Sequence, residues 1–229
     1  MKQPGGTDGQ KRRAGERAAA AVPDGAVVGL GTGSTAAAAI RALGDRVASG
    51  LAVRAVPTSY QSRRLAREAS IPLVTLEDAT PDLAIDGADQ VAGFDLVKGG
   101  GAAHAREKLV ATAADRYLVV IDETKLAGVL SIAVPIEVLP DAVPVVRSRL
   151  GALGGEPTLR AAERKDGPVV TDNGNLVLDC AFGEIPDPEA LADGIAAIPG
   201  VVEHGLFVSM TDALYVGTDS GVDVRDAPK

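Results

Sequence analysis

Residues that bind metals or form disulfides are scarce in this sequence. Cys180 is the only cysteine among 229 residues, and His104 and His204 are the only histidines. These residues do not form a Cys/His cluster at metal-ligand spacing, so we predict no metal site. Cys180 stands in an apolar run at 175–182 without a nearby base. This setting predicts a buried thiol in a strand rather than a nucleophile.

Aromatic residues, basic clusters and long apolar runs are also scarce. Aromatic residues make up 3% of the chain, Lys and Arg are scattered, and the formal net charge is −8. Nucleic-acid binding needs stacking side chains or basic patches, and a membrane span needs a longer apolar run. The start of the chain also lacks a signal-peptide core. We therefore expect a cytoplasmic protein that binds neither nucleic acid nor membrane.

The first part of the chain alternates between strand-like and helix-like patterns. Hydrophobic residues make up 46% of the chain, enough for a substantial core. Strands are expected at 26–30, 52–56, 73–76, 83–86 and 117–121, and helices at 10–22, 34–47, 59–69 and 103–113. Such alternation predicts an α/β fold, a Rossmann-like parallel sheet with helices on both faces.

The pattern changes after about Leu130. Pro135, Pro140 and Pro144 fall within ten residues of one another. Thr171-Asp-Asn-Gly-Asn175 is typical of a hairpin turn, and a helix is expected at 188–198. We predict a smaller α+β subdomain at 131–205. Residues 1–130 and 206–229 would then form the Rossmann-like domain.

A glycine-rich segment joins the first predicted strand to the next helix. Gly29-Leu-Gly-Thr-Gly-Ser-Thr35 has neither the Gly-x-Gly-x-x-Gly spacing of dinucleotide sites nor a Gly-Lys-Ser/Thr ending. Two interpretations stay open. Free backbone N–H groups at the helix start could cradle a phosphate, or the segment is a tight turn capped by Ser34.

A carboxylate pair follows the predicted strand at 83–86. Asp86-Gly-Ala-Asp89 stands where the carboxyl edge of a parallel sheet binds ligands. Two nearby carboxylates can separate their pKa values, so that one holds or passes a proton. A solvated turn is the alternative.

A lysine, three glycines and a glutamate follow within twenty residues. In Lys98-Gly-Gly-Gly101 the glycines let the backbone approach a ligand, and the lysine could stabilise an oxyanion. Arg106-Glu-Lys108 falls in the first turn of the next predicted helix. Each motif alone could be a surface feature, but together they indicate proton-transfer chemistry at one sheet edge.

In this order, the motifs resemble the ribose-5-phosphate isomerases of type A. The resemblance extends over nearly the whole chain through further matching segments: 56–59, 122–125, 135–138, 153–155, 171–175, 198–202 and 205–207. It implies a Rossmann-like domain with a smaller ferredoxin-like α+β subdomain. It also implies interconversion of ribose 5-phosphate and ribulose 5-phosphate through an enediolate in the pentose phosphate pathway, without a cofactor, by a homodimer or homotetramer.

The resemblance also implies roles for individual residues. Glu107 matches the base that moves a proton between C2 and C1, Lys98 stabilises the enediolate, and Asp86 and Asp89 handle hydroxyl protons. The substrate-binding positions are Thr32, Gly33, Ser34, Thr35, Gly87, Ala88, Gly99, Gly100, Gly101, Lys125 and Lys11. His104 stands beside these motifs and is expected to be a packed or solvated histidine without a catalytic role.

Two other functions are compatible with the motifs. One is a related sugar-phosphate isomerase or deaminase. The other is a non-catalytic sugar-phosphate sensor, although such proteins usually carry a helix-turn-helix, for which the N-terminal region is too short.

Overall fold

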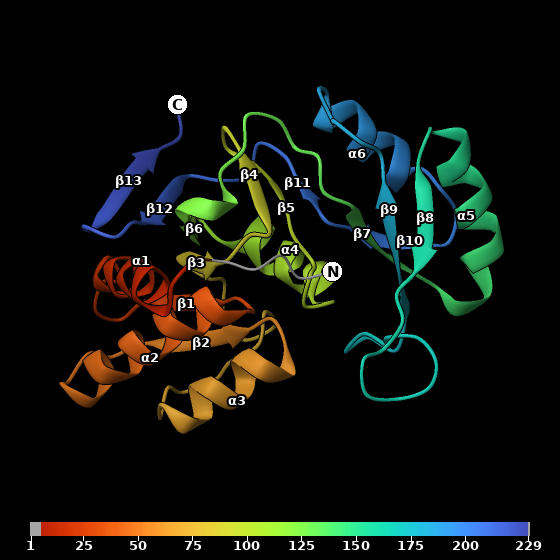
Figure 1. The fold of residues 1–229 in the computed structure, drawn as a ribbon. Coiled ribbons are helices and arrows are strands. Elements are labelled where there is room, and N and C mark those ends of the chain that lie inside the picture. Colours follow the sequence, from red (N-terminus) through yellow and green to blue (C-terminus); the bar gives the residue numbers. More distant parts are fainter. Residues whose placement is uncertain (1–5, 229) are drawn as a thin grey trace. The chain divides into compact units, whose positions relative to one another are not determined.

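The computed structural model describes residues 6–228, which divide into two compact units (Figure 1). Residues 6–88, 106–126 and 209–228 form the larger unit, and residues 89–105 and 127–208 form the smaller unit. Helix α4 (His104–Ala113) begins in the smaller unit and continues into the larger one. The domain boundaries expected from the sequence, near 130 and 206, stay a prediction.

The larger unit is built on a six-stranded sheet with the order β13-β12-β6-β3-β1-β2. All neighbours pair in parallel except β13, which runs antiparallel to β12. The strands are β1 (Val27–Leu30), β2 (Arg54–Pro57), β3 (Leu83–Asp86), β6 (Tyr117–Asp122), β12 (Ala213–Gly217) and β13 (Val222–Asp226). The predicted α/β class with a mainly parallel sheet is confirmed.

Helices cover both faces of this sheet because successive strand residues point to opposite sides. In β1, Val28 and Leu30 pack in one core cluster with Ile40 of α2. Gly29 faces the other way, where a Cβ atom would lie 2.4 Å from Val110 of α4. The helices of the first face are α1 (Asp8–Ala20), α2 (Ser34–Ala48) and α3 (Tyr60–Glu68).

Helices α1 and α2 approach each other closely at Gly15. A Cβ atom at this position would lie 2.5 Å from the backbone nitrogen of Ala39 and 2.9 Å from the carbonyl carbon of Ala38. Only glycine fits between the two backbones. This contact holds α2, and with it the segment before α2, against the N-terminal helix.

One local prediction is wrong, and so is the Ser34 cap that one of the two open interpretations contained. The segment at 73–76 is not a strand: only Leu73 forms a bridge, to Ala55. The chain turns away directly afterwards because Asp78 accepts hydrogen bonds from the backbone N–H and the hydroxyl of Thr75, at 2.9 and 2.8 Å. Likewise Ser34 does not cap α2. The capping position is Gly33, with a φ of +108°, and Ser34 is the first helical residue.

The smaller unit contains a four-stranded antiparallel sheet with the order β10-β7-β9-β8. Its chain order, strand-helix-strand-strand-helix-strand, is ferredoxin-like, as the family resemblance implied. The elements are β7 (Val134–Val138), a short 3-10 turn η2 (Pro140–Ala142), α5 (Val143–Ala152), β8 (Glu156–Leu159), β9 (Leu176–Ala181), α6 (Pro188–Ala196) and β10 (Val201–His204).

A second, three-stranded antiparallel sheet completes the smaller unit. It has the order β11-β5-β4 and consists of β4 (Gln90–Ala92), β5 (Asp95–Val97) and β11 (Leu206–Phe207). Pairing of β5 with β11 groups residues 89–105 with the segment at 127–208. The loop after Asp89 therefore belongs to a different unit from Asp86.

Cys180 lies in β9 with no exposed surface. Burial, and then the nearby Glu156 carboxylate, raises the pKa of its thiol to about 12. The folded pKa lies above the usual value of about 8.5. The neutral thiol therefore costs the folded protein no stability at neutral pH. Stability falls only as the pH rises above about 8.5, where the thiol ionises in the unfolded chain but not in the folded one.

Native Cys180 should therefore react very slowly with thiol reagents. At pH 8 its thiolate fraction is about a thousandfold below that of an ordinary cysteine, and burial blocks access further. We expect Ellman's reagent to label the native protein at less than about one thousandth of the rate measured in urea. Labelling of the native protein within minutes would contradict this assignment.

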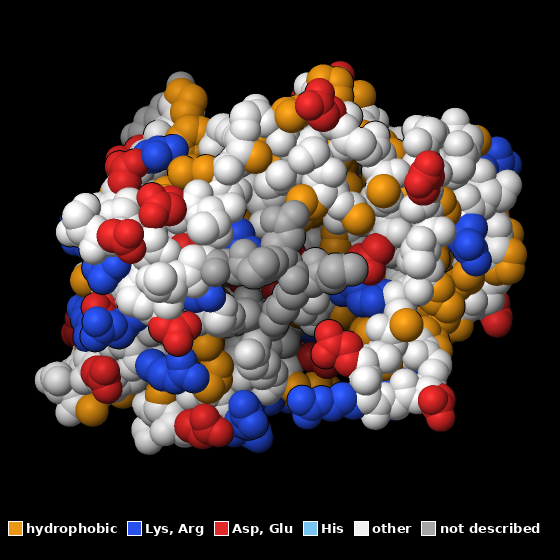
Figure 2. Space-filling model, viewed as in Figure 1, with side chains coloured by type: hydrophobic (Ala, Val, Ile, Leu, Met, Phe, Trp, Pro, Cys, Tyr) orange, Lys and Arg blue, Asp and Glu red, His pale blue; other side chains and the backbone are white. Residues whose placement is uncertain are grey.

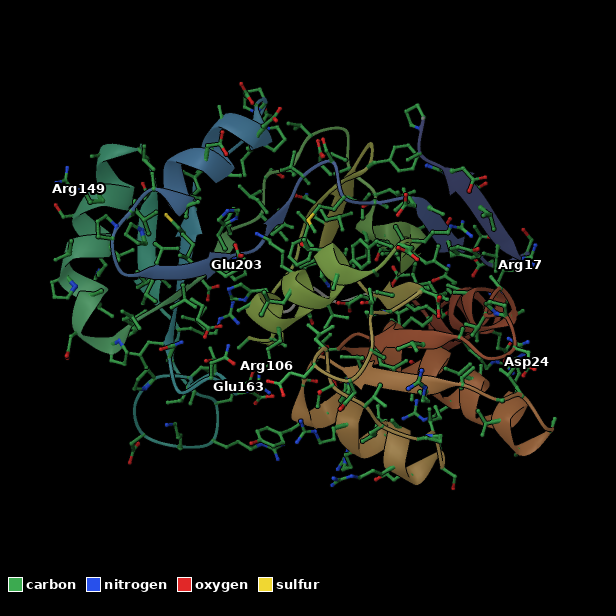
Figure 3. The ribbon with its side chains drawn as sticks, turned by 180° about the vertical axis from the view of Figure 1, so that it is seen from behind. Arg17, Asp24, Arg106, Arg149, Glu163 and Glu203 are labelled. Carbon is green, nitrogen blue, oxygen red and sulfur yellow. The ribbon has the colours of Figure 1, made fainter. Side chains whose placement is uncertain are left out.

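Charged side chains of both signs mix on the surface. Figure 2 shows Asp and Glu side chains interspersed with Lys and Arg over α1 and α2, and Figure 3 shows Arg149 at the outer side of α5. Among residues 6–228, no helix is both long enough and apolar enough to span a membrane.

Candidate active site

The segment Thr32–Thr35 joins β1 to α2 in the larger unit. Gly33, the capping residue, has no side chain that could accept hydrogen bonds from the first N–H groups of α2. A Cβ atom at Gly33 would meet nothing within 4 Å, so the turn opens onto free space. A helix start of this kind favours an anion, because its N–H groups carry partial positive charge.

Thr32 ties this turn to two neighbouring strand ends. Its backbone N–H donates to Oδ1 of Asp86 at 3.0 Å. Its hydroxyl donates to the Ser59 hydroxyl at 2.7 Å and lies 3.1 Å from the Thr58 hydroxyl. Ser59 also caps α3 by accepting from the N–H of Ser62 at 3.1 Å. The 57–59 segment thus has a structural role, because it caps α3 and anchors the turn at Thr32.

Asp86 ends β3 and is only 2% exposed. The pairing of β3 with β1 brings it to the turn at Thr32. Besides the Thr32 N–H, its Oδ1 accepts the Gly87 N–H at 2.7 Å. A carboxylate with two backbone donors is held in one orientation. Gly87 and Ala88, which follow it, are partly exposed in the same unit.

Glu107 lies in the first turn of α4 and is 4% exposed. The positive end of the helix dipole stabilises a carboxylate in this position. A surface glutamate, the alternative raised by the sequence, is excluded by this burial. Few water molecules can compete for a buried carboxylate, which suits a group that exchanges protons with a bound molecule.

The glycine loop Gly99–Gly101 lies in the smaller unit, together with Asp89 and Lys98. Oδ2 of Asp89 accepts the backbone N–H of Gly100 at 2.7 Å. Gly99 has a φ of +106°, and a Cβ atom there would lie 2.7 Å from Nδ1 of His104. Only glycine fits beside that ring. His104 itself has no exposed surface, as expected for a packed histidine.

Lys98 is 2% exposed, which is unusual for a lysine. Its backbone N–H donates to the carbonyl of Gly205 at 2.8 Å. Its ammonium lies 5.3 Å from the centre of the Phe207 ring, within range of a cation–π interaction. The solvated lysine suggested by the isolated motif is therefore wrong. Sequence reasoning named the segment at Phe207 but did not connect its ring with Lys98.

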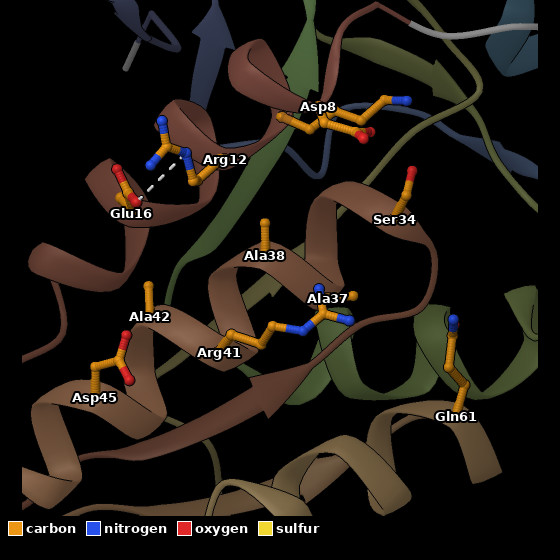
Figure 4. Close-up of a pocket in the computed structure, with 11 residues that line it drawn as sticks. Asp8, Arg12, Glu16, Ser34, Ala37, Ala38, Arg41, Ala42, Asp45 and Gln61 are labelled. Carbon is orange, nitrogen blue, oxygen red and sulfur yellow. Dashed lines mark ion pairs between the residues drawn. The ribbon is translucent and has the colours of Figure 1, made fainter.

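A cavity of about 750 Å³ lies between α1 and α2 in the larger unit (Figure 4). Its lining includes Lys11 of α1, Ser34 of α2 and Gln61 of α3. The structure therefore brings two of the predicted substrate-binding residues to one pocket. Arg12 also lines the cavity and pairs with Glu16 at 3.9 Å on the surface.

Lys125 ends a short 3-10 helix, η1 (Glu123–Lys125), directly after β6. Asp122 fixes this turn by accepting the N–H of Thr124 at 3.1 Å. Lys125 is partly exposed. Within residues 6–228, no three His, Cys, Asp or Glu side chains are arranged to hold a metal ion.

Comparisons with known proteins agree on one family. Residues 54–221 match the family described as ribose 5-phosphate isomerase A (phosphoriboisomerase A). The ribose-5-phosphate isomerase A of Natronomonas pharaonis is 74% identical over 98% of this chain and all of its own length. That of Haloarcula marismortui is 65% identical over the full length of both chains.

Solved structures give the same result. Ribose 5-phosphate isomerase A from Methanocaldococcus jannaschii superposes with a TM-score of 0.92 at 44% identity, covering 95% of this chain and 98% of its own. A D-ribose-5-phosphate isomerase in complex with phospho-erythronic acid superposes with a TM-score of 0.94 at 39% identity, covering 96% and 99%. The chain belongs to the ribose 5-phosphate isomerase A family.

Proposed function

We infer that this protein interconverts D-ribose 5-phosphate and D-ribulose 5-phosphate. The observation that carries this conclusion is identity of up to 74% with ribose-5-phosphate isomerases A along essentially the whole chain. The buried carboxylates Asp86 and Glu107 and the buried cation of Lys98 are the groups that an aldose–ketose isomerisation needs.

We assign the proton transfer to Glu107. The open-chain aldose carries an acidic hydrogen on C2, next to its C1 carbonyl. Glu107 removes this proton, the electron pair forms the C1–C2 double bond of an enediolate, and the negative charge moves to the C1 oxygen. The proton of the C2 hydroxyl moves to the C1 oxygen, which leaves the negative charge on the C2 oxygen. The C2 carbonyl then forms as the electron pair of the double bond takes the proton back from Glu107 at C1, which gives the ketose. Burial shields Glu107 from water, and the positive end of the helix dipole lies at the first turn of α4 where Glu107 stands, which supports this role.

The negative charge of the enediolate needs a cation, and we assign this task to Lys98. Its side chain is buried beside the Phe207 ring, which restricts the ammonium to one place. We assign the hydroxyl protons, including those moved when the sugar ring opens, to Asp86 and Asp89. Both carboxylates accept backbone N–H groups, which fixes the direction in which they face.

We propose that the phosphate binds at the turn before α2, with Lys125 and Lys11 as its cations. The open turn at Gly33 and the pocket shared by Lys11 and Ser34 support this assignment. An acidic protein must supply local positive charge for such a ligand. Backbone contacts to the sugar would come from Gly87, Ala88 and the glycine loop.

A direct assay tests the function. The protein is mixed with ribose 5-phosphate and excess EDTA, and ribulose 5-phosphate is followed by its absorbance. We expect sustained ketose formation without release of ammonia. Ammonia release from an amino-sugar phosphate, with no ketose from ribose 5-phosphate, would favour the deaminase instead. We further propose, from the family, a cytoplasmic homodimer or homotetramer.

A further inference from the structure

The side chain of Arg160 reaches from the ferredoxin-like sheet to the glycine loop of the same unit. Arg160 follows β8, and its Nη1 donates to the carbonyl oxygen of Gly99 at 2.8 Å and lies 3.5 Å from that of Gly100. Asp179 of β9 orients the guanidinium from the other side. It accepts Nε–H at 2.8 Å on Oδ2 and Nη2–H on Oδ1.

One peptide group is thereby held at both ends. The carbonyl of Gly99 and the N–H of Gly100 belong to the same planar peptide and point in opposite directions. Arg160 binds the carbonyl, and Oδ2 of Asp89 accepts the N–H at 2.7 Å. A cation at the oxygen polarises the peptide and strengthens the hydrogen bond that its N–H donates. Arg160 therefore acts on Asp89 across a single peptide.

The loop needs such a restraint because its own residues provide little. Three consecutive glycines have wide conformational freedom. Gly99 and Ala102 both have positive φ angles, +106° and +57°. Within the loop, the Ala102 N–H donates to the Gly99 carbonyl at 2.9 Å, so this oxygen accepts from both Ala102 and Arg160.

Strand pairing does not require the Arg160 side chain. Its backbone N–H already donates to the carbonyl of Val177 at 2.9 Å, and β8 and β9 pair along Glu156–Leu159. Both side chains of the Arg160–Asp179 pair are mostly buried, at 13% and 18% exposure. A buried cation directed at the backbone of one loop indicates a task beyond joining two strands.

We propose that Arg160 is a positioning residue for the isomerisation, acting through the Gly99–Gly100 peptide on Asp89. The proposal rests on the role assigned above to Asp89. Arg160 does not touch the sugar. It keeps the Asp89 carboxylate in one orientation and the backbone of the glycine loop after Lys98 in one conformation.

The test is a double-mutant cycle between Arg160→Met and Asp89→Asn. We expect Arg160→Met to lower kcat about tenfold, with KM changed less than about twofold, because the bound phosphate is unaffected. In the Asp89→Asn background the same change should have almost no further effect, because the carboxylate it acts on is gone. Arg160→Lys should restore part of the lost kcat.

A matched control is available in the exposed loop after β8, where Glu163 is labelled in Figure 3. Arg164 of this loop is exposed, and Arg164→Met should leave kcat and KM unchanged. Circular dichroism and the melting temperature establish that each variant is folded. If Arg160→Met does not fold, Arg160→Gln, which keeps a donor without the charge, is measured by the same criteria.

The outcomes separate this proposal from the assignment of Asp89. A wild-type kcat for folded Arg160→Met, or an equal loss of kcat in the Asp89→Asn background, would overturn the proposal alone. A wild-type kcat for Asp89→Asn would overturn the role of Asp89 and the proposal with it.

Discussion

Replacing Glu107 by glutamine should lower kcat about a thousandfold while leaving the protein folded and able to bind its ligand. The amide has nearly the shape of the carboxylate, so this 4% exposed position keeps its packing. The variant loses only the ability to accept a proton from carbon, because an amide is not a base. Because that step occurs only after binding, the loss should appear in kcat rather than in ligand affinity.

The measurement combines steady-state kinetics with calorimetric titration of phospho-erythronic acid, the ligand of a related isomerase. Its carboxylate carries two oxygens at the end of a hydroxylated chain, much as an enediolate does. Glu189→Gln is the matched control, since Glu189 also lies in the first turn of a helix, α6, but is exposed. A Glu107→Gln variant with the wild-type rate would rule out Glu107 as the base.

Gly31→Ala should damage both activity and stability although it adds one methyl group. A Cβ atom at Gly31 would lie 2.0 Å from Cγ and Oδ1 of Asp86. The carboxylate cannot easily move away, because its Oδ1 accepts hydrogen bonds from the N–H groups of Thr32 and Gly87 and the side chain is buried. We expect a loss of about 2 kcal/mol in unfolding free energy and at least about a hundredfold in kcat/KM.

Chemical denaturation and kinetics on the same sample test this prediction. Gly151→Ala is the control, because Gly151 lies in α5 with an ordinary φ, and a Cβ atom added there would meet nothing within 4 Å. Alanine there should be neutral or stabilising by up to about 1 kcal/mol, through helix propensity. Normal activity in Gly31→Ala would mean that Asp86 tolerates displacement and is not needed in one fixed orientation.

The buried strands could be predicted from the sequence, because β1, β3 and β6 are continuous apolar runs between turns, but their order in the sheet could not. The same reasoning located Asp86 at the end of β3. It failed at 73–76, where apolar residues suggested a strand but the Thr75–Asp78 turn ends the pairing. It also passed over β4 and β5, which have three residues each and too little periodicity to detect.

The contacts made by candidate site residues were less predictable than the residues themselves. Nothing in the sequence around Arg160 indicates a bond to Gly99, which lies 61 positions earlier. Burial of Lys98 under the Phe207 ring depends equally on the pairing of β5 with β11. Such contacts arise only when distant strands pair, and local patterns carry no trace of them.

The strand order of the larger unit also determines how long β6 lacks a neighbouring strand during biosynthesis. β12 covers one edge of β6, yet residues 123–212, which include most of the smaller unit, separate them in the chain. At a synthesis rate of about 5–20 residues per second, synthesis of the residues between β6 and β12 takes roughly five to twenty seconds. During that time an apolar strand has one unpaired edge. A nascent chain of this protein is therefore most exposed to aggregation while the ferredoxin-like segment is being translated.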